Sequence, residues 1–208
     1  MRQFMSIRFD HDALNRWTDD PYVEPGERRE RHKAKERILN VAKNRLSSLD
    51  LQGLRLSTLP DVFDDISFAR VMNVNLRGNN ITSLPKTMRI LSGLQKLDIS
   101  DCPHFQQFSG GTENWKKMSY IFFENCPNLS PRFLVQLSEV PSPGCELRYE
   151  KENMERLLIP EQQPALPPPL SMGLIRQTND IGFEQITLRE FMQSDRIIRS
   201  IDEIRRTA

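Results

Sequence analysis

Apolar residues recur along the middle of the chain in a short pattern that returns after 25 residues. Each copy has two aliphatic residues separated by one position, Leu49 and Leu51 first and then Val74 and Leu76. Because successive side chains of a strand point to opposite faces, each pair faces one side of a short strand. A period of about 20 to 30 residues is typical of a solenoid, in which neighbouring units stack to bury a shared core.

The pattern continues towards the carboxy terminus and predicts four repeats and a fifth, degenerate strand. The later pairs are Leu97 and Ile99, Ile121 and Phe123, and Cys145 and Leu147. The segments between strands predict helical turns on the convex side. Asn79 follows the second strand, where its amide can hydrogen-bond backbone groups that the turn leaves unpaired, and Cys102 and Cys126 occupy the equivalent positions.

An amphipathic helix is predicted before the repeats. Ala34, Ile38 and Val41 recur at steps of three and four residues and form one apolar stripe. A solenoid exposes its first core layer unless something covers it, so the helix is interpreted as an amino-terminal cap. Its basic residues outnumber its acidic ones eight to three, and a surface for nucleic acid or anionic membrane is the alternative.

The chain divides into five predicted segments. These are a disordered or loosely docked arm (1–25), the helical cap (26–46), the repeat domain (47–158), a proline-rich linker (159–170) and a carboxy-terminal helical segment (171–208). Thr187 and Glu190 form a capping box that opens a helix to about residue 205. Its apolar side either folds back along the solenoid or docks on a partner. An SH3 ligand at Pro164 and Pro167 is the alternative to a linker, but a basic flanking residue is missing.

Composition and charge are typical of a water-soluble protein that acts by binding through its surface. The 208 residues carry a formal net charge of +1, and no apolar run approaches the roughly 18 residues of a membrane span. The amino terminus lacks the apolar core of a classical secretory signal, which leaves export by a specialised route open. We expect a monomer that binds a protein partner, binds no nucleic acid and has no membrane span.

The sequence contains no catalytic constellation, so we expect no enzyme activity and no cofactor. The three histidines lie apart from any nucleophile motif, and no glycine-rich phosphate loop occurs. Cys102, Cys126 and Cys145 match no zinc spacing and are interpreted as reduced structural thiols, with a metal or redox pair as the alternative.

The polar residues that alternate with the buried pairs are predicted to line the concave sheet. The candidate protein-binding residues are Asn73, Asn75, Arg77, Lys96, Asp98, Tyr120, Phe122, Glu124 and Arg148. Tyr120 and Phe122 place two aromatic rings side by side, and aromatic residues dominate binding hot spots. They are therefore the predicted anchor, with Arg77 and Arg148 in support. The alternative is that the carboxy-terminal segment covers the fourth strand and buries both rings within the protein.

Residues 46–129 resemble leucine-rich repeat proteins, on the stretches LSSLDLQGLRLSTLP and VNLRGNNITSLPKTMRILSGLQKLDIS. The segment AKERILNVAKNRLSSLDLQGLRLSTLPD resembles the start of the repeats in bacterial leucine-rich repeat effectors, which are delivered into host cells. Many such effectors carry a ubiquitin-ligase domain, for which the segment after Leu158 is too short. The repeats are longer than the roughly 20 residues usual in that class, Cys145 lacks the acidic motif of the catalytic cysteine, and plant and animal repeat proteins are similar over the same stretch.

The prediction is an α/β fold: a short leucine-rich repeat solenoid of four to five repeats, with a parallel sheet on the concave face, a helical amino-terminal cap and a carboxy-terminal helical extension. The expected function is protein recognition on the concave face, by a secreted bacterial effector that binds a host protein. One alternative is a substrate-recognition adaptor for a ubiquitin ligase acting in trans. Another is a regulatory or structural module whose tail masks its own binding face.

Overall fold

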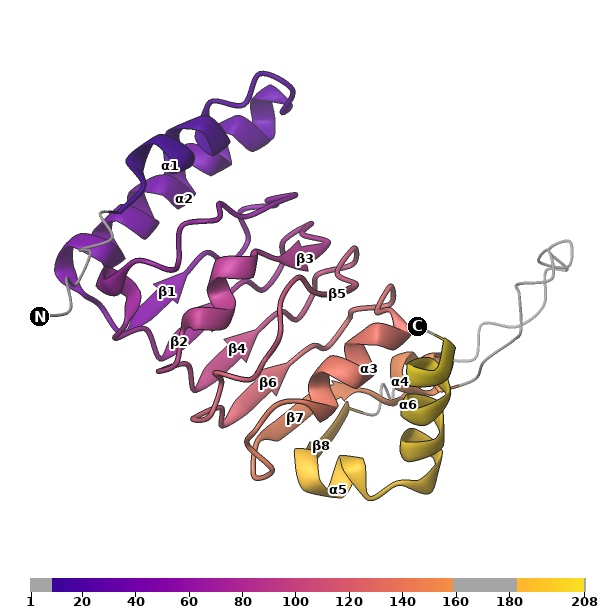
Figure 1. Ribbon diagram of the computed structural model, residues 1–208. Coiled ribbons are helices and arrows are strands. Elements are labelled where there is room, and N and C mark those ends of the chain that lie inside the picture. Colours follow the sequence, from indigo (N-terminus) through magenta and orange to yellow (C-terminus); the bar gives the residue numbers. More distant parts are fainter. Residues whose placement is uncertain (1–8, 159–182, 208) are drawn as a thin grey trace, which may run out of the picture.

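The computed structural model describes residues 9–158 and 183–207, and shows a row of short parallel strands with helices at both ends (Figure 1). The parallel strands, in spatial order, are β1 (Ser48–Asp50), β2 (Asn73–Asn75), β4 (Lys96–Asp98), β6 (Tyr120–Phe122) and β7 (Glu146–Glu150). A separate small sheet pairs β3 (Ser83–Leu84) with β5 (Gln107–Phe108). The predicted linker and the start of the predicted carboxy-terminal segment lie outside the described residues.

The predicted strand register is confirmed for the first four strands, whereas in the fifth Ile121 pairs with Leu147 and not with Cys145, which lies just before β7. Leu49, Val74, Leu97, Ile121 and Leu147 pair in turn across the sheet, and each is at most 1% exposed. Their side chains therefore form one continuous core under the sheet, as expected for stacked repeats. The fold class is that predicted from the sequence: an α/β solenoid with a mostly parallel sheet.

The far side of the repeats is built from short helical segments. Two 3-10 turns, Ile66–Phe68 and Lys86–Ile90, follow the first two strands, and α3 (Pro131–Ser138) and α4 (Lys151–Leu157) belong to the later units. The core beneath α3 is aromatic, because the ring of Phe133 lies 5.1 Å from that of Phe108 and 5.2 Å from that of Phe123. Buried aromatic rings in such pairs stabilise beyond their area alone.

A ladder of side-chain hydrogen bonds joins consecutive repeats at the turn after each strand. Asn79 Nδ2 donates to the carbonyl of Leu51 (2.9 Å) in the preceding repeat. The Cys102 thiol donates to the carbonyl of Leu76 (3.3 Å), and the Cys126 thiol to that of Ile99 (3.1 Å). The three residues therefore do the same work in successive units, as their spacing in the sequence predicts.

We expect Asn79→Ala to lower the free energy of unfolding by about 2–4 kcal/mol. Asn79 is fully buried, and besides Leu51 its amide serves the carbonyl of Leu76 (2.6 Å) and the N–H of Leu56 (3.0 Å). Each buried group left without a partner costs about 1–3 kcal/mol. Urea unfolding followed by circular dichroism measures the loss.

The matched variant is Asn79→Cys, which restores the donor that Cys102 and Cys126 supply in the next two repeats. We expect its cost to lie between those of wild type and Asn79→Ala, because the single S–H restores the bond to Leu51, whereas the bond to Leu76 and the acceptor for Leu56 are lost. Equal costs for the two variants would show that the repeat-to-repeat bond contributes little.

Two helices cover the amino-terminal end of the solenoid, where one was predicted. α2 (Pro25–Asn44) lies over β1 and buries Ala34, Ile38 and Val41, so the predicted cap is present. The arm predicted as disordered or loosely docked instead contains α1 (His11–Thr18), whose Leu14 is fully buried. Asp10 caps this helix by accepting a hydrogen bond from the Ala13 N–H (2.7 Å).

The described part of the tail closes the opposite end of the solenoid. β8 (Phe183–Thr187) adds an antiparallel strand to β7, and α6 (Asp195–Thr207) packs on α3. The capping box at Thr187 and Glu190 is present and opens α5 (Leu188–Met192). One continuous helix was predicted here, but the structure has two, because residues 193–194 interrupt the helix between α5 and α6. No described helix is both long and apolar enough to cross a membrane.

Candidate protein-binding face

The nine candidate residues lie together on one face of the main sheet. The paired strands place them in three columns: Asn73, Lys96 and Tyr120 in the first, Asn75, Asp98, Phe122 and Arg148 in the second, and Arg77 and Glu124 in the third. Arg77, Tyr120 and Arg148 are exposed, and most of the others are half-buried. Glu124 is the exception to the prediction of an accessible face, because it is only 7% exposed.

The second column has a structural task in the first three strands. Asp50 Oδ1 accepts a hydrogen bond from the Gln52 N–H (3.0 Å), and Asp98 Oδ1 accepts one from the Ser100 N–H (3.0 Å). Asn75 Oδ1 accepts the equivalent bond two residues on (3.2 Å). An aspartate or asparagine there closes the turn at the strand end.

Phe122 breaks this rule in the fourth strand. A phenyl ring cannot accept the hydrogen bond from the N–H of Glu124, and the hydroxyl of Ser100 accepts it instead (3.3 Å). Ser100 is 1% exposed and serves the turn of the next repeat, a role that sequence reasoning missed. The fold therefore compensates for an aromatic residue that the turn itself does not require.

Tyr120 and Phe122 form an open aromatic platform. Their ring centroids lie 6.0 Å apart, and Tyr120 is 40% exposed. The ammonium of Lys96 lies 4.8 Å from the centroid of Phe122. β8 joins the sheet beyond β7 and leaves β6 between β4 and β7, so the tail residues that the structure describes, 183–207, do not cover the rings.

Both candidate arginines are held by carboxylates. Arg148 Nε pairs with Glu124 Oε1 (2.5 Å), and Arg77 Nε pairs with Asp101 Oδ2 (2.7 Å). The amide of Asn125 donates to the other oxygen of Asp101 (2.5 Å). Asp101 and Asn125 are network members that the column pattern missed, because they lie one residue beyond the third column.

The cysteine thiols are buried and reduced in this structure. Burial raises the pKa of Cys102 to about 11 and that of Cys145 to about 12, and it raises the pKa of Cys126 still further. Thiols with raised pKa values react slowly, because the thiolate is the nucleophile. Among the described residues no group of three metal-ligating side chains could hold an ion. Burial of the three thiols, and the hydrogen bonds of Cys102 and Cys126 to the preceding repeats, fit a structural role for the cysteines.

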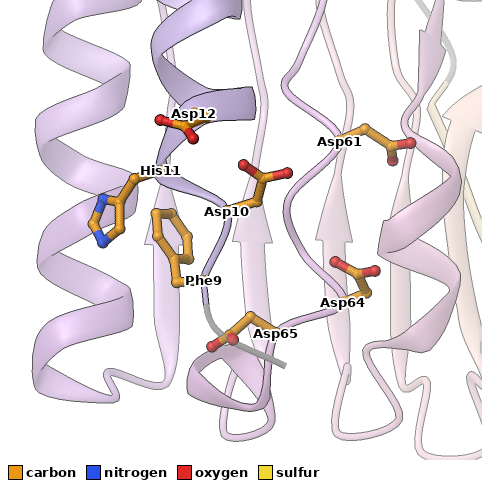
Figure 2. A pocket seen from close by; sticks show the side chains of 7 residues that line it. All are labelled: Phe9, Asp10, His11, Asp12, Asp61, Asp64 and Asp65. Atoms are coloured by element: carbon orange, nitrogen blue, oxygen red, sulfur yellow. The ribbon is translucent and has the colours of Figure 1, made fainter. Parts of the chain in front are cut away.

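A hollow near the amino terminus gathers carboxylates from α1 and the first repeat (Figure 2). Several of these groups have a structural use. Asp61 Oδ1 accepts hydrogen bonds from the N–H (2.9 Å) and hydroxyl (2.7 Å) of Thr87, and Asp65 Oδ1 accepts one from the Ser67 N–H (2.8 Å). Together with the capping role of Asp10, turns and caps account for three of the five carboxylates.

Distant structural likenesses exist among solved proteins. Neither a protein-family profile nor a curated protein matches the sequence. The chain is similar to the leucine-rich repeat domain of a Shigella effector, at 22% identity, 54% coverage of each chain and a TM-score of 0.42. It is also similar to that of the type III effector XopL, at 15% identity, a TM-score of 0.35, and coverage of 70% of this chain and 66% of that one. The chain thus spans about half to two thirds of these domains.

The chain's own geometry defines the fold class. Parallel strands recur with the predicted register, aliphatic pairs stack beneath them, and an asparagine–cysteine ladder joins the turns. These features are those of a leucine-rich repeat solenoid, with helices at both ends and a polar concave sheet that carries one aromatic platform.

Proposed function

We propose that this chain is a non-enzymatic protein-recognition module that binds its partner through the concave sheet. The observation that carries the proposal is Phe122, which stands where the first three strands have a turn-closing aspartate or asparagine and lies beside the exposed Tyr120. Aromatic rings on an accessible surface are the usual anchors of protein interfaces, where few residues supply most of the binding energy. The neighbouring ion pairs supply a polar rim.

Capture of partners tests the proposal. The full chain and the double variant Tyr120→Ala/Phe122→Ala are immobilised and exposed to the same host-cell lysate. The matched control is Ile66→Ala/Ile90→Ala, which removes two exposed aliphatic side chains, 68% and 46% exposed, from the 3-10 turns on the far side of the repeats.

We expect a partner that wild type and the control variant retain and the platform variant loses by at least tenfold in affinity. A partner that the platform variant retains with unchanged affinity would move the interaction to the caps or the tail. That result would contradict recognition by the concave face.

A secreted effector that acts on a host protein is the finer form of this proposal. It rests on the sequence resemblance of the cap and first repeat to bacterial effectors. A translocation reporter fused to the full chain tests it, and no reporter signal in host cells from bacteria with active specialised secretion would contradict it.

The adaptor alternative receives less support. It requires an apolar side of the tail helix to dock on a ligase in trans, but Ile197 and Ile201 of α6 are 5% and 2% exposed, and α6 packs on α3. Recognition through the concave face needs no such rearrangement.

A further inference from the structure

The charge on the concave face is uneven once its ion pairs are counted. Its three columns hold five carboxylates against three basic groups: Asp50, Asp98, Glu124, Glu146 and Glu150 against Arg77, Lys96 and Arg148. Both arginines are already paired. In the described parts of the chain, no ion pair joins Asp98 or Glu146 to a basic side chain.

These two carboxylates flank the aromatic platform from opposite sides. Asp98 on β4 is in register with Phe122, and Glu146 on β7 is in register with Tyr120. Neighbouring strands lie about 4.8 Å apart, so each carboxylate stands directly beside a ring.

The platform already holds a cation. The ammonium of Lys96 lies 4.8 Å from the Phe122 centroid, and the negative face of an aromatic ring attracts a positive group at this distance. The ring face is therefore accessible to a cation, although Lys96 occupies only Phe122 and belongs to the protein itself.

Acidic residues also cluster at the carboxyl ends of β6 and β7, beside the platform. Burial raises the pKa of Glu150, and repulsion from Glu152 and Glu124 contributes to the increase, although Arg148 pairs with Glu124. A positive group brought by a partner would relieve this repulsion.

Building on the recognition role proposed above, we propose that the platform binds an arginine side chain in an extended, basic segment of the partner protein. Its guanidinium stacks on the exposed ring of Tyr120, lies beside the inclined ring of Phe122, and pairs with Asp98 and Glu146. Arginine fits better than lysine, because its flat and weakly hydrated guanidinium both stacks on rings and makes two parallel hydrogen bonds to a carboxylate.

A peptide titration of the isotope-labelled full chain tests the inference. The probe is an amidated peptide of alternating glycine and arginine, and its control has citrulline, which is neutral and of the same shape, in place of arginine. We expect the arginine peptide to shift amide signals in β4, β6 and β7, and to bind at least fivefold more tightly than the citrulline peptide.

The chain offers a variant that removes charge and keeps the turn. Asn75 accepts the same turn-closing bond as Asp98, so Asp98→Asn should fold normally. We expect Asp98→Asn to weaken the arginine peptide about fivefold to tenfold. Asp50→Asn, the same change in the same column two repeats away, is the matched control and should leave the affinity unchanged.

Lys96→Gln provides a readout that a purely structural role would not give. It removes the resident cation from Phe122, so we expect the arginine peptide to bind more tightly. Equal binding of the arginine and citrulline peptides, equal effects of Asp98→Asn and Asp50→Asn, or shifts confined to other elements would each overturn the inference. The proposed function would survive any of these results if the captured partner is still lost from the platform variant.

Discussion

Arg31→Ala should lower the free energy of unfolding of the amino-terminal cap by about 3–5 kcal/mol, the usual cost of breaking a buried ion pair from one side. The side chain of Arg31 is 3% exposed, and its Nε donates to Glu27 Oε1 (2.9 Å). Its two terminal nitrogens reach the carbonyl of Trp17 (2.7 Å) on α1 and the hydroxyl of Thr58 (3.0 Å) in the first repeat. One guanidinium thus ties both cap helices to the solenoid.

The Arg31→Ala substitution would also leave Glu27 without its counter-ion. Glu27 Oε1 accepts hydrogen bonds from the N–H (3.1 Å) and hydroxyl (2.7 Å) of Ser57. Burial alone would raise the pKa of Glu27, but the bonds from Ser57 and Arg31 outweigh it and lower the pKa overall. The carboxylate is therefore charged in the folded protein and would remain half-buried without its counter-ion.

Tryptophan fluorescence measures this effect, because Trp17 lies 5.0 Å below the Arg31 guanidinium. The other tryptophan, Trp115, is buried in the repeats, so a Trp115→Phe background isolates the signal of the cap. Arg29→Ala, on an exposed position of α2, is the control and should cost within about 0.5 kcal/mol. A loss below about 1 kcal/mol for Arg31→Ala would mean that the cap is held by its apolar contacts alone.

Leu76→Ala should cost about 2–5 kcal/mol, because a large side chain deleted from a close-packed core leaves a cavity. Leu76 is fully buried, directly beneath the concave sheet. Phe122→Ala, two repeats away on the opposite face of the sheet, should cost about 1 kcal/mol or less, since its ring is half-buried. Urea unfolding of both variants gives the comparison.

Comparing the losses of unfolding free energy in these two variants shows whether Phe122 serves binding or packing. A ring kept for binding contributes little to folding, whereas a ring kept for packing costs as much as Leu76 when it is removed. Equal losses for the two variants would contradict the platform as a binding anchor, even if a partner were also lost.

The repeats could be predicted from the sequence because their signal is periodic. The spacing of Leu49, Val74 and Leu97 determines which residues pair, and so places Tyr120 and Phe122 on the concave face. The cap helix carries a clear stripe of Ala34, Ile38 and Val41. Both signals repeat over many residues, which is why local exceptions do not obscure them.

The missed elements lack such repetition. α1 spans eight residues and fully buries a single aliphatic residue, Leu14, so no period emerges. β8 is five residues long and forms only because β7 offers it a free edge, which is a tertiary cause. The burial of Ser100 and Glu124 also has a tertiary cause, because the Ser100 hydroxyl accepts the bond from the Glu124 N–H that Phe122 cannot accept, and Glu124 pairs with Arg148 of the next strand.

The most direct test of the account is a hydrogen-exchange footprint of the full chain bound to its captured partner. Recognition through the concave sheet predicts protection from exchange across β4, β6 and β7, strongest around Tyr120 and Phe122, with α1 and the 3-10 turns unchanged. Protection confined to α1 and α2, or to α5 and α6, with the three strands unaffected, would contradict it.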